Sequence, residues 1–256
     1  MKYILLLLVV LVQSLAMAKV VVEKVNYKQG DTALEGYLAY DDALKGQRPG
    51  FVIVHDWMGI SDFVKGKAEA LAKEGYVAIA ADIYGKGVRA KNAEEAGKLA
   101  GLYKGDRKLM RARAQAALEK LLSTNRVNPK KVIAMGYCFG GTVALELARS
   151  CADLAGTVTF HGGLSTPTPA DAKCIAGRIL ALHGADDPFV NEKEVAEFQG
   201  EMRNGGVDWQ MISYGGAVHA FTNPLAGTDN KQGAAYNAKA DKRSWADFHT
   251  FLKEVL

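Results

Sequence analysis

A tight strand-to-helix turn around Cys138 constrains the fold more than any other feature of the sequence. The segment reads Gly136-Tyr137-Cys138-Phe139-Gly140-Gly141 and directly follows the apolar run 132–135. Glycines lack a Cβ atom, so they let the chain pass from strand to helix within a few residues. The positive end of the following helix favours a thiolate and can bind an oxyanion. We interpret Cys138 as a nucleophile; the alternative is a small core residue, as many free cysteines are.

The first 18 residues have the pattern of a secretory signal peptide. Lys2 precedes an apolar run from Tyr3 to Val12, and the segment 16–18 reads Ala-Met-Ala, a small-residue cleavage pattern. The run is too short for a comfortable membrane span, although an uncleaved N-terminal anchor is an alternative. We therefore expect residues 1–18 to be removed and residues 19–256 to form one α/β domain. The mature protein would be periplasmic or secreted, without stable membrane association.

Charge and motif content exclude several classes of function. The formal net charge of +4 becomes +3 when Lys2 leaves with the signal peptide. So weak and dispersed an excess gives no reason to expect nucleic-acid binding. The histidines and acids show no metal-ligand spacing, and no glycine-rich phosphate-binding loop is present in the sequence. We expect no metal and no cofactor, and a monomer or a weak homodimer.

The three cysteines, Cys138, Cys151 and Cys174, are interpreted in the light of export. In an oxidising compartment thiols tend to form disulfides. Cys151 ends the helix that starts after Cys138, and Cys174 lies just before the predicted strand 178–183. If the strands 156–160 and 178–183 are neighbours, both cysteines fall at the same edge of the sheet. We therefore predict a Cys151–Cys174 disulfide and a free Cys138; three free thiols are the alternative.

Apolar strand-like runs alternate with amphipathic helices along most of the chain. The predicted strands are 20–25, 34–40, 51–54, 76–81, 132–137, 156–160, 178–183 and 209–214, and the predicted helices are 62–74, 106–123, 139–151, 192–204 and 238–256. This alternation indicates a mostly parallel sheet of about eight strands with helices on both faces. In such sheets functional groups gather at the carboxyl ends of the strands, where Cys138 lies.

A thiol nucleophile needs a base, and the base needs a group that orients it. The order along the chain in α/β hydrolases is nucleophile, acid, histidine. Asp186 and Asp187 follow the strand 178–183, and the continuation Asp-Pro-x-Val favours Asp187 as the acid. His219 lies in a glycine-rich loop after the strand 209–214, where the base is expected. The alternative for His219 is a structural loop histidine.

The other four histidines have weaker claims. His161 ends the strand beside the nucleophile strand and is expected to line the substrate pocket. His55 and His183 end strands, where local hydrogen bonds could satisfy them. His249 lies on the last helix and is interpreted as a surface or packing residue.

An oxyanion requires two well-placed backbone donors. In this architecture one is the amide of the residue after the nucleophile, Phe139. The second comes from the loop after the strand 51–55, and we expect it to be the amide of Trp57. These two amides are the predicted oxyanion hole.

The motif around Cys138, followed in order by Asp187 and His219, resembles the dienelactone hydrolase (carboxymethylenebutenolidase-like) family. The similarity extends from about residue 30 to the C-terminus and includes the segment 81–85, which reads Ala-Asp-Ile-Tyr-Gly. The cysteine makes the resemblance specific, because most α/β hydrolases have serine at this turn. The resemblance implies an α/β-hydrolase fold and hydrolysis of a small ester or lactone through a thioester acyl-enzyme.

Two positions depart from the family pattern. Where the family has a glutamate that hydrogen-bonds the resting thiol, this chain has Asp56, one methylene shorter, and the resemblance implies that it tunes the thiol. The enzyme that opens dienelactone holds the substrate carboxylate with arginines, and one of these positions is Asn223 here. Because an amide cannot supply that charge, dienelactone itself is disfavoured. Arg89 and Lys91 are candidates to bind an anionic group; solvated side chains are the alternative.

Two rival functions remain beside a cysteine hydrolase. A non-catalytic ligand-binding protein on the hydrolase fold is one, although the complete set of Cys138, Asp187 and His219 argues against it. A peptidase or acyltransferase of the same fold is the other. The sequence has no obvious lid insertion or extra domain that would select peptides, which weakens the peptidase alternative.

Overall fold

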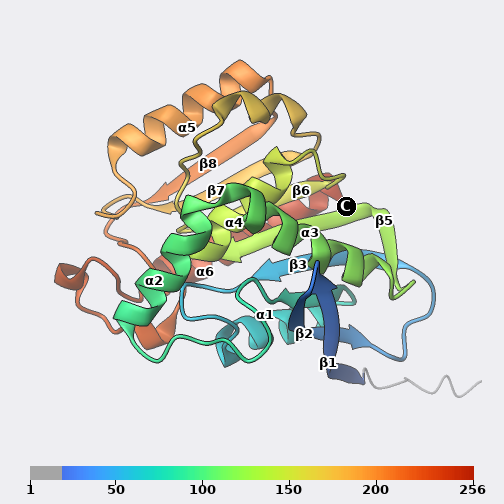
Figure 1. Ribbon diagram of the computed structural model, residues 1–256. Coiled ribbons are helices and arrows are strands. Elements are labelled where there is room, and N and C mark those ends of the chain that lie inside the picture. Colours follow the sequence, from blue (N-terminus) through green and yellow to red (C-terminus); the bar gives the residue numbers. More distant parts are fainter. Residues whose placement is uncertain (1–18) are drawn as a thin grey trace, which may run out of the picture.

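The computed structural model describes residues 19–256, so the predicted signal peptide lies outside the described residues. Eight strands form one sheet in the order β1-β2-β4-β3-β5-β6-β7-β8 (Figure 1). Their bounds are β1 (Val20–Gln29), β2 (Thr32–Asp41), β3 (Arg48–Val54), β4 (Val77–Ala81), β5 (Val127–Tyr137), β6 (Gly156–Phe160), β7 (Arg178–Gly184) and β8 (Trp209–Tyr214). The predicted sheet is confirmed, and β5 starts earlier than the sequence indicated.

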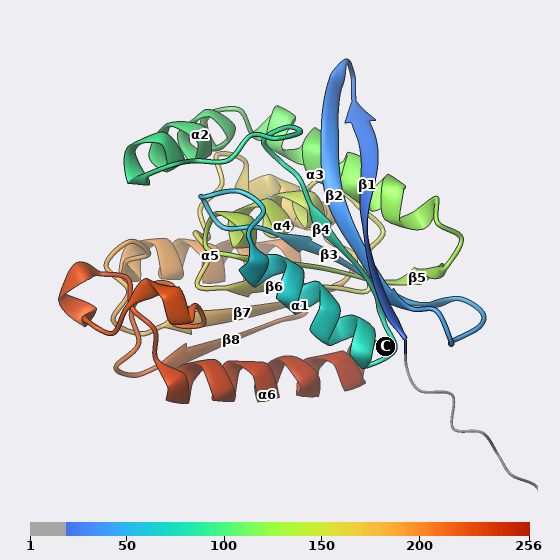
Figure 2. The same cartoon turned by 90° about the horizontal axis from the view of Figure 1, so that it is seen from below.

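The sheet is mostly parallel. β1 pairs with β2, and β2 with β4, in antiparallel fashion; all other neighbouring strands are parallel. The predicted N-terminal hairpin is therefore present, and it extends beyond the other strands (Figure 2). Parallel strands require crossover connections, which place helices on the faces of the sheet.

Helices cover both faces of the sheet. They are α1 (Asp62–Lys73), α2 (Ala93–Gly105), α3 (Arg107–Leu122), α4 (Phe139–Arg149), α5 (Glu192–Gly205) and α6 (Ala238–Val255), with 3₁₀ turns η1 (Pro169–Cys174), η2 (Pro224–Ala226) and η3 (Asn230–Gln232). Side chains alternate along each strand, so Val52 and Val54 join the core with α3, α4 and α5, whereas Phe51 and Ile53 join the core with α1 and α6. Figure 2 shows these two layers on opposite sides of the sheet.

Helix α2 was not predicted from the sequence. Three glycines at 97, 101 and 105 lower the helix propensity of this segment. The helix nevertheless begins with a capping signal, because the Asn92 side chain accepts a hydrogen bond from the Glu95 amide at 3.0 Å. Ala96, Ala100 and Tyr103 anchor it in the core. The cap and the burial of these side chains therefore outweigh the low helix propensity of the three glycines.

Cys151 and Cys174 form a disulfide that ties the end of α4 to η1, with Cα atoms 4.7 Å apart. This is the pairing expected from the sequence, and Cys138 is the free cysteine among residues 19–256. In the same range, no helix is long and apolar enough to cross a membrane.

We expect removal of this disulfide to destabilise the protein without changing its activity. A cross-link between positions 23 residues apart contributes about 3 kcal/mol by restricting the unfolded chain. For a domain of this size, the Cys151→Ser/Cys174→Ser double variant should melt about 6–12 °C lower, measured by circular dichroism. Cys138 lies at the opposite end of α4, so turnover should persist. A stabilising disulfide would be contradicted if the double variant melted at the wild-type temperature and if dithiothreitol left the melting temperature of the wild type unchanged.

Candidate active site

Cys138 occupies the sharp turn between β5 and α4. Its backbone has φ +56° and ψ −118°, a region that residues with a Cβ atom rarely adopt and that is common at functional turns. A Cβ atom at Gly136 would lie 2.0 Å from the Gly140 carbonyl oxygen, and one at Gly140 would lie 2.3 Å from the Val54 carbonyl oxygen. Glycine is therefore required on both sides of the turn, and the start of α4 packs directly on the end of β3.

His219 and Asp187 lie together at the carboxyl edge of the sheet. His219 Nδ1 is 2.7 Å from Asp187 Oδ2, and the Asp187 side chain is almost fully buried while Asp186 is exposed. The other Asp187 oxygen accepts the Phe189 amide at 2.9 Å, which fixes the carboxylate in its loop. The structure thus brings Asp187, and not Asp186, to the histidine.

The charge of His219 depends on both of its partners. Burial alone would lower the pKa of His219, but the nearby negative charge of Cys138 and the hydrogen bond to Asp187 raise it to about 10. The imidazole therefore favours its protonated form when the thiol is ionised. Such an arrangement can hold a thiolate as nucleophile and an imidazolium as proton donor.

The two predicted oxyanion donors lie in adjacent segments. Phe139 is the first residue of α4, so its amide has no acceptor within the helix. Trp57 follows β3, and its amide makes no hydrogen bond to any of residues 19–256. β3 pairs with β5 up to Val54 and Gly136, which brings the ends of both strands to the same edge. Two free amides at this edge can stabilise a developing negative charge.

Asp56 is engaged with its own loop. Its Oδ1 accepts the Met58 amide at 2.8 Å, and no hydrogen bond to Cys138 occurs in the described part of the chain. Burial raises the pKa of Asp56, although the Met58 hydrogen bond and the charge of His219 oppose this shift. Asp56 is therefore close enough to act on the site electrostatically, and its effect on the thiol stays a prediction.

His161 packs behind His219. Only 2% of His161 is exposed, its Nε2 lies 2.8 Å from Thr222 Oγ1, and its ring is 5.3 Å from that of His219. Burial lowers the pKa of His161 well below its usual value, so the ring is neutral. His161 thus packs against His219, and its place in a substrate pocket stays a prediction.

The residues considered in connection with an anionic substrate are Arg89, Lys91 and Asn223, and a role of Arg89 or Lys91 in binding one stays a prediction. Arg89 Nε donates to the Ile60 carbonyl oxygen at 2.9 Å, and a guanidinium nitrogen lies 3.9 Å from Asp82. Lys91 is exposed. The Asn223 side chain caps η2 by accepting the Leu225 amide at 3.0 Å. Arg89 and Asn223 are thus committed to holding loops.

Phe189 lies at the site, although the sequence did not predict it there. Its ring stands edge-on to His219 at 5.5 Å although 60% of the residue is exposed. Trp57, in the loop with the predicted oxyanion donor, is also 39% exposed. The only sequence signal for Phe189 was its position two residues after Asp187. These apolar surfaces can contact an uncharged substrate group.

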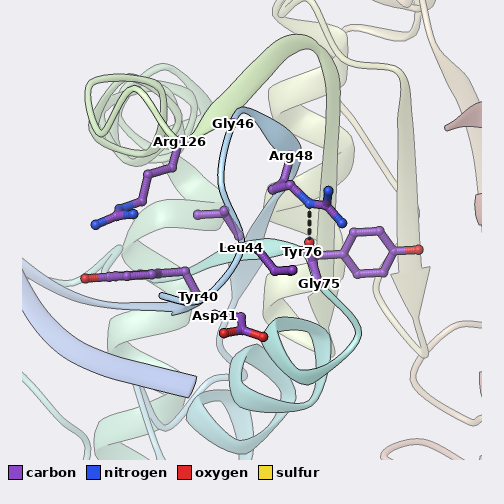
Figure 3. Close-up of a pocket in the computed structure, with 9 residues that line it drawn as sticks. Tyr40, Asp41, Leu44, Gly46, Arg48, Gly75, Tyr76 and Arg126 are labelled. Carbon is purple, nitrogen blue, oxygen red and sulfur yellow. Dashed lines mark hydrogen bonds between the residues drawn. The ribbon is translucent and has the colours of Figure 1, made fainter. Parts of the chain in front are cut away.

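A separate polar depression lies away from Cys138. It is lined by Tyr40, Asp41, Leu44, Gly46, Arg48, Gly75, Tyr76, Val77 and Arg126 (Figure 3). Arg48 and Val77 begin β3 and β4, so this depression marks the amino edge of the sheet, opposite the strand ends that carry the chemistry. Across residues 19–256, no cluster of three or more histidine, cysteine or acidic side chains could hold a metal ion.

The sequence and structure of this chain were compared with those of known proteins and protein families. The model of the dienelactone hydrolase family matches residues 34–256. A Bradyrhizobium protein named probable 2-oxo-3-(5-oxofuran-2-ylidene)propanoate lactonase is 30% identical over 73% of this chain and 79% of its own length. The crystal structure of a dienelactone hydrolase-like promiscuous phosphotriesterase from metagenomic libraries is 40% identical, covers 92% of this chain and 98% of its own, and has a TM-score of 0.87.

A second solved structure, m3DLH, is 39% identical and covers 93% of this chain and 99% of its own, with a TM-score of 0.89. These similarities extend over nearly the whole described domain and include the strand-to-helix turn of Cys138. The α/β-hydrolase fold expected from the sequence is confirmed. The protein is a dienelactone hydrolase-like hydrolase, and the chain belongs to the dienelactone hydrolase family.

Proposed function

We propose that this protein hydrolyses small, uncharged esters or lactones through a thioester formed on Cys138. The observation that carries the proposal is the hydrogen bond between His219 and Asp187 beside a free thiol at a strained turn. Nucleophile, base and orienting acid in this geometry are the set that acyl transfer requires.

In the first half-reaction, the Cys138 thiolate attacks the carbonyl carbon of the ester. The amides of Phe139 and Trp57 hold the resulting oxyanion. The intermediate collapses as the bond to the leaving alkoxide breaks, and the His219 imidazolium gives that oxygen its proton. The alcohol departs, or stays tethered when the substrate is a lactone, and the acyl group remains on sulfur as a thioester.

In the second half-reaction, water replaces the alcohol. Neutral His219 takes a proton from the water molecule while the water oxygen attacks the thioester carbonyl carbon. Collapse of this intermediate breaks the carbon–sulfur bond, releases the carboxylic acid and restores the thiolate beside the imidazolium. Asp187 holds the Nδ1–H throughout, so that Nε2 faces the reacting groups and the charged ring is stabilised.

The proposed preference for uncharged substrates is supported by the surroundings of the site. Asn223 caps a helical turn and carries no charge to pair with a substrate carboxylate, and Arg89 donates to the Ile60 carbonyl oxygen and lies beside Asp82. Phe189 and Trp57 present apolar surface instead. A phosphotriester is a second candidate substrate, because a relative 40% identical to this chain is described as a promiscuous phosphotriesterase.

The proposal is tested with a panel of substrates and the purified protein from residue 19. We expect turnover of p-nitrophenyl esters and neutral lactones, and slower turnover of lactones that carry a carboxylate. A phosphotriester such as paraoxon tests the second candidate. Faster turnover of the carboxylated lactones would contradict the substrate preference. No turnover by the panel, together with a Cys138 that iodoacetamide does not alkylate, would favour the ligand-binding alternative.

We also propose that the protein is exported and acts, as a monomer or weak homodimer, after cleavage behind Ala18. The Cys151–Cys174 disulfide supports this proposal, since structural disulfides persist in oxidising compartments. N-terminal sequencing of the protein from its native cell should begin at Lys19, and a sequence beginning at Met1 would contradict cleavage.

A further inference from the structure

His55 is a fully buried histidine at the end of β3, directly before the loop that carries Trp57. Its Nδ1 lies 2.6 Å from the Asp56 carbonyl oxygen, and its Nε2 lies 3.3 Å from the Ile83 amide nitrogen. A carbonyl can only accept and an amide N–H can only donate, so the ring is neutral with its proton on Nδ1. Burial lowers the pKa of His55 to about 4, which preserves this tautomer at neutral pH.

The hydrogen bond from His55 fixes the direction of the Trp57 amide. The Asp56 carbonyl and the Trp57 N–H belong to the same peptide group, and a trans peptide is planar with these two groups on opposite sides. Residues 19–256 contain no cis peptide bond. Holding the carbonyl oxygen on one side therefore points the N–H to the other side.

A second anchor holds the next peptide of the same loop. The Tyr84 hydroxyl donates to the Trp57 carbonyl oxygen at 2.9 Å, and the Gly59 amide donates to the Asp56 carbonyl oxygen at 3.3 Å. The Asp56 and Trp57 carbonyl groups are thus both engaged, while the Trp57 amide has no hydrogen-bond partner among residues 19–256. The loop is held in the orientation that exposes this donor.

The ring of His55 also contacts the residue that carries the other donor. It lies stacked on Phe139, with centroids 6.0 Å apart and planes at 24°. On another side it meets Tyr84 edge-on at 4.7 Å. One buried imidazole therefore touches the segments of both predicted oxyanion donors and the tyrosine that anchors one of them.

We propose that His55 is a positioning residue that orients the oxyanion hole by holding the Asp56–Trp57 peptide. The inference rests on the proposed function, because an oxyanion forms only if Cys138 attacks an acyl group. His55 touches no substrate and exchanges no proton in the reaction. Its effect is on the transition state, in which the charge on the carbonyl oxygen is largest.

The test compares three variants at position 55 with p-nitrophenyl acetate. His55→Phe keeps an aromatic ring but removes both hydrogen bonds, and should lower kcat about 10- to 100-fold, less than outright loss of an oxyanion donor, with KM near the wild-type value. His55→Gln offers an amide donor and an acceptor and should recover most of the rate. His55→Asn is shorter and should recover less than glutamine.

The rate at which iodoacetamide alkylates Cys138 distinguishes a specific effect on the oxyanion hole from a general disturbance of the site, because a general disturbance would change this rate. Alkylation forms no oxyanion, so its rate should equal that of the wild type in all three variants. His249→Phe, the same change on helix α6, is the matched control and should retain kcat. If His55→Phe does not fold, the comparison of His55→Gln with His55→Asn decides the question.

Wild-type kcat in folded His55→Phe, or in His55→Asn, would overturn the inference, as would a parallel fall of turnover and alkylation. These outcomes leave turnover dependent on Cys138, so the proposed function would survive them. Turnover that persists in Cys138→Ala would instead refute the proposed function and the role of His55 together.

Discussion

Replacing Cys138 by alanine should abolish ester hydrolysis and leave the fold intact. Without sulfur there is no nucleophile and no acyl-enzyme, and loss of such a group costs at least about 10⁴-fold in kcat. The side chain is only partly buried, and its strained backbone is fixed by Gly136 and Gly140, so the turn should persist. Turnover of a p-nitrophenyl ester and the melting temperature measure the two expectations.

Cys138→Ser is the finer test of the same mechanism. The hydroxyl is similar in size, but serine is a poor nucleophile unless a base removes its proton during attack. We expect a folded protein that loses much of the rate, with KM little changed because substrate contacts are retained. Full activity in the alanine variant would rule out covalent catalysis by Cys138. Full activity in the serine variant would show that a preformed thiolate is not needed.

The second large effect is expected for His219→Gln, which should lower kcat by about 10⁴-fold, as loss of the base in comparable triads does. Glutamine retains a polar group of similar length but cannot carry the proton between the thiol and the leaving group. Asp187→Asn is the companion variant: it leaves His219 in place but removes the charge that orients it, so it should also lower kcat. Activity near the wild-type level in either variant would contradict the proposed roles.

The raised pKa of His219 gives this variant a second signature. Because the pKa of His219 is raised to about 10, the imidazolium stays beside the sulfur across the neutral range. We therefore expect iodoacetamide to alkylate Cys138 more slowly in His219→Gln than in the wild type at neutral pH, because the thiolate loses its neighbouring cation. Equal alkylation rates in the two proteins would show that His219 does not stabilise the thiolate.

The same shift predicts how stability depends on pH. A histidine whose pKa is higher in the folded state stabilises the protein fully below its unfolded value, about 6.5, and loses this contribution as pH rises through its folded value. With a folded pKa of about 10, the difference in unfolding free energy between the wild type and His219→Gln should narrow between neutral pH and about 10. Urea unfolding of both proteins at several pH values measures this difference in unfolding free energy. A difference that widens as pH rises would contradict a raised pKa of His219.

Local sequence patterns predicted much of the architecture. Continuous apolar runs identified β3 and β5 as strands buried on both faces, and the glycines around Cys138 identified the turn, because these patterns depend on residues close together in the chain. The pattern failed at α2, where glycines hid a helix that is stabilised by its cap and by burial of Tyr103. Propensity is a weak guide where tertiary contacts decide.

The candidate site divides in the same way. Chain order proposed Cys138, Asp187 and His219, and the structure brings Asp187 and His219 within hydrogen-bonding distance. Chain order did not predict that His161 and Phe189 both pack against the ring of His219. It also did not predict that His55 hydrogen-bonds the carbonyl oxygen of Asp56, in the peptide before Trp57. Each of these contacts depends on the path of a loop, which residue types alone do not specify.

By itself, therefore, the sequence determined most of the helices and strands, the tight turn at Cys138 and the chemistry that a thiol at that turn can perform. Those features follow from glycine sterics, side-chain periodicity and residue type, all of which act within a few positions along the chain. Only the tertiary structure decided the contacts of His161 and Phe189 with His219 and the neighbours of His55. Such contacts join residues from separate loops, whose positions are fixed only once the sheet has assembled and its core has packed.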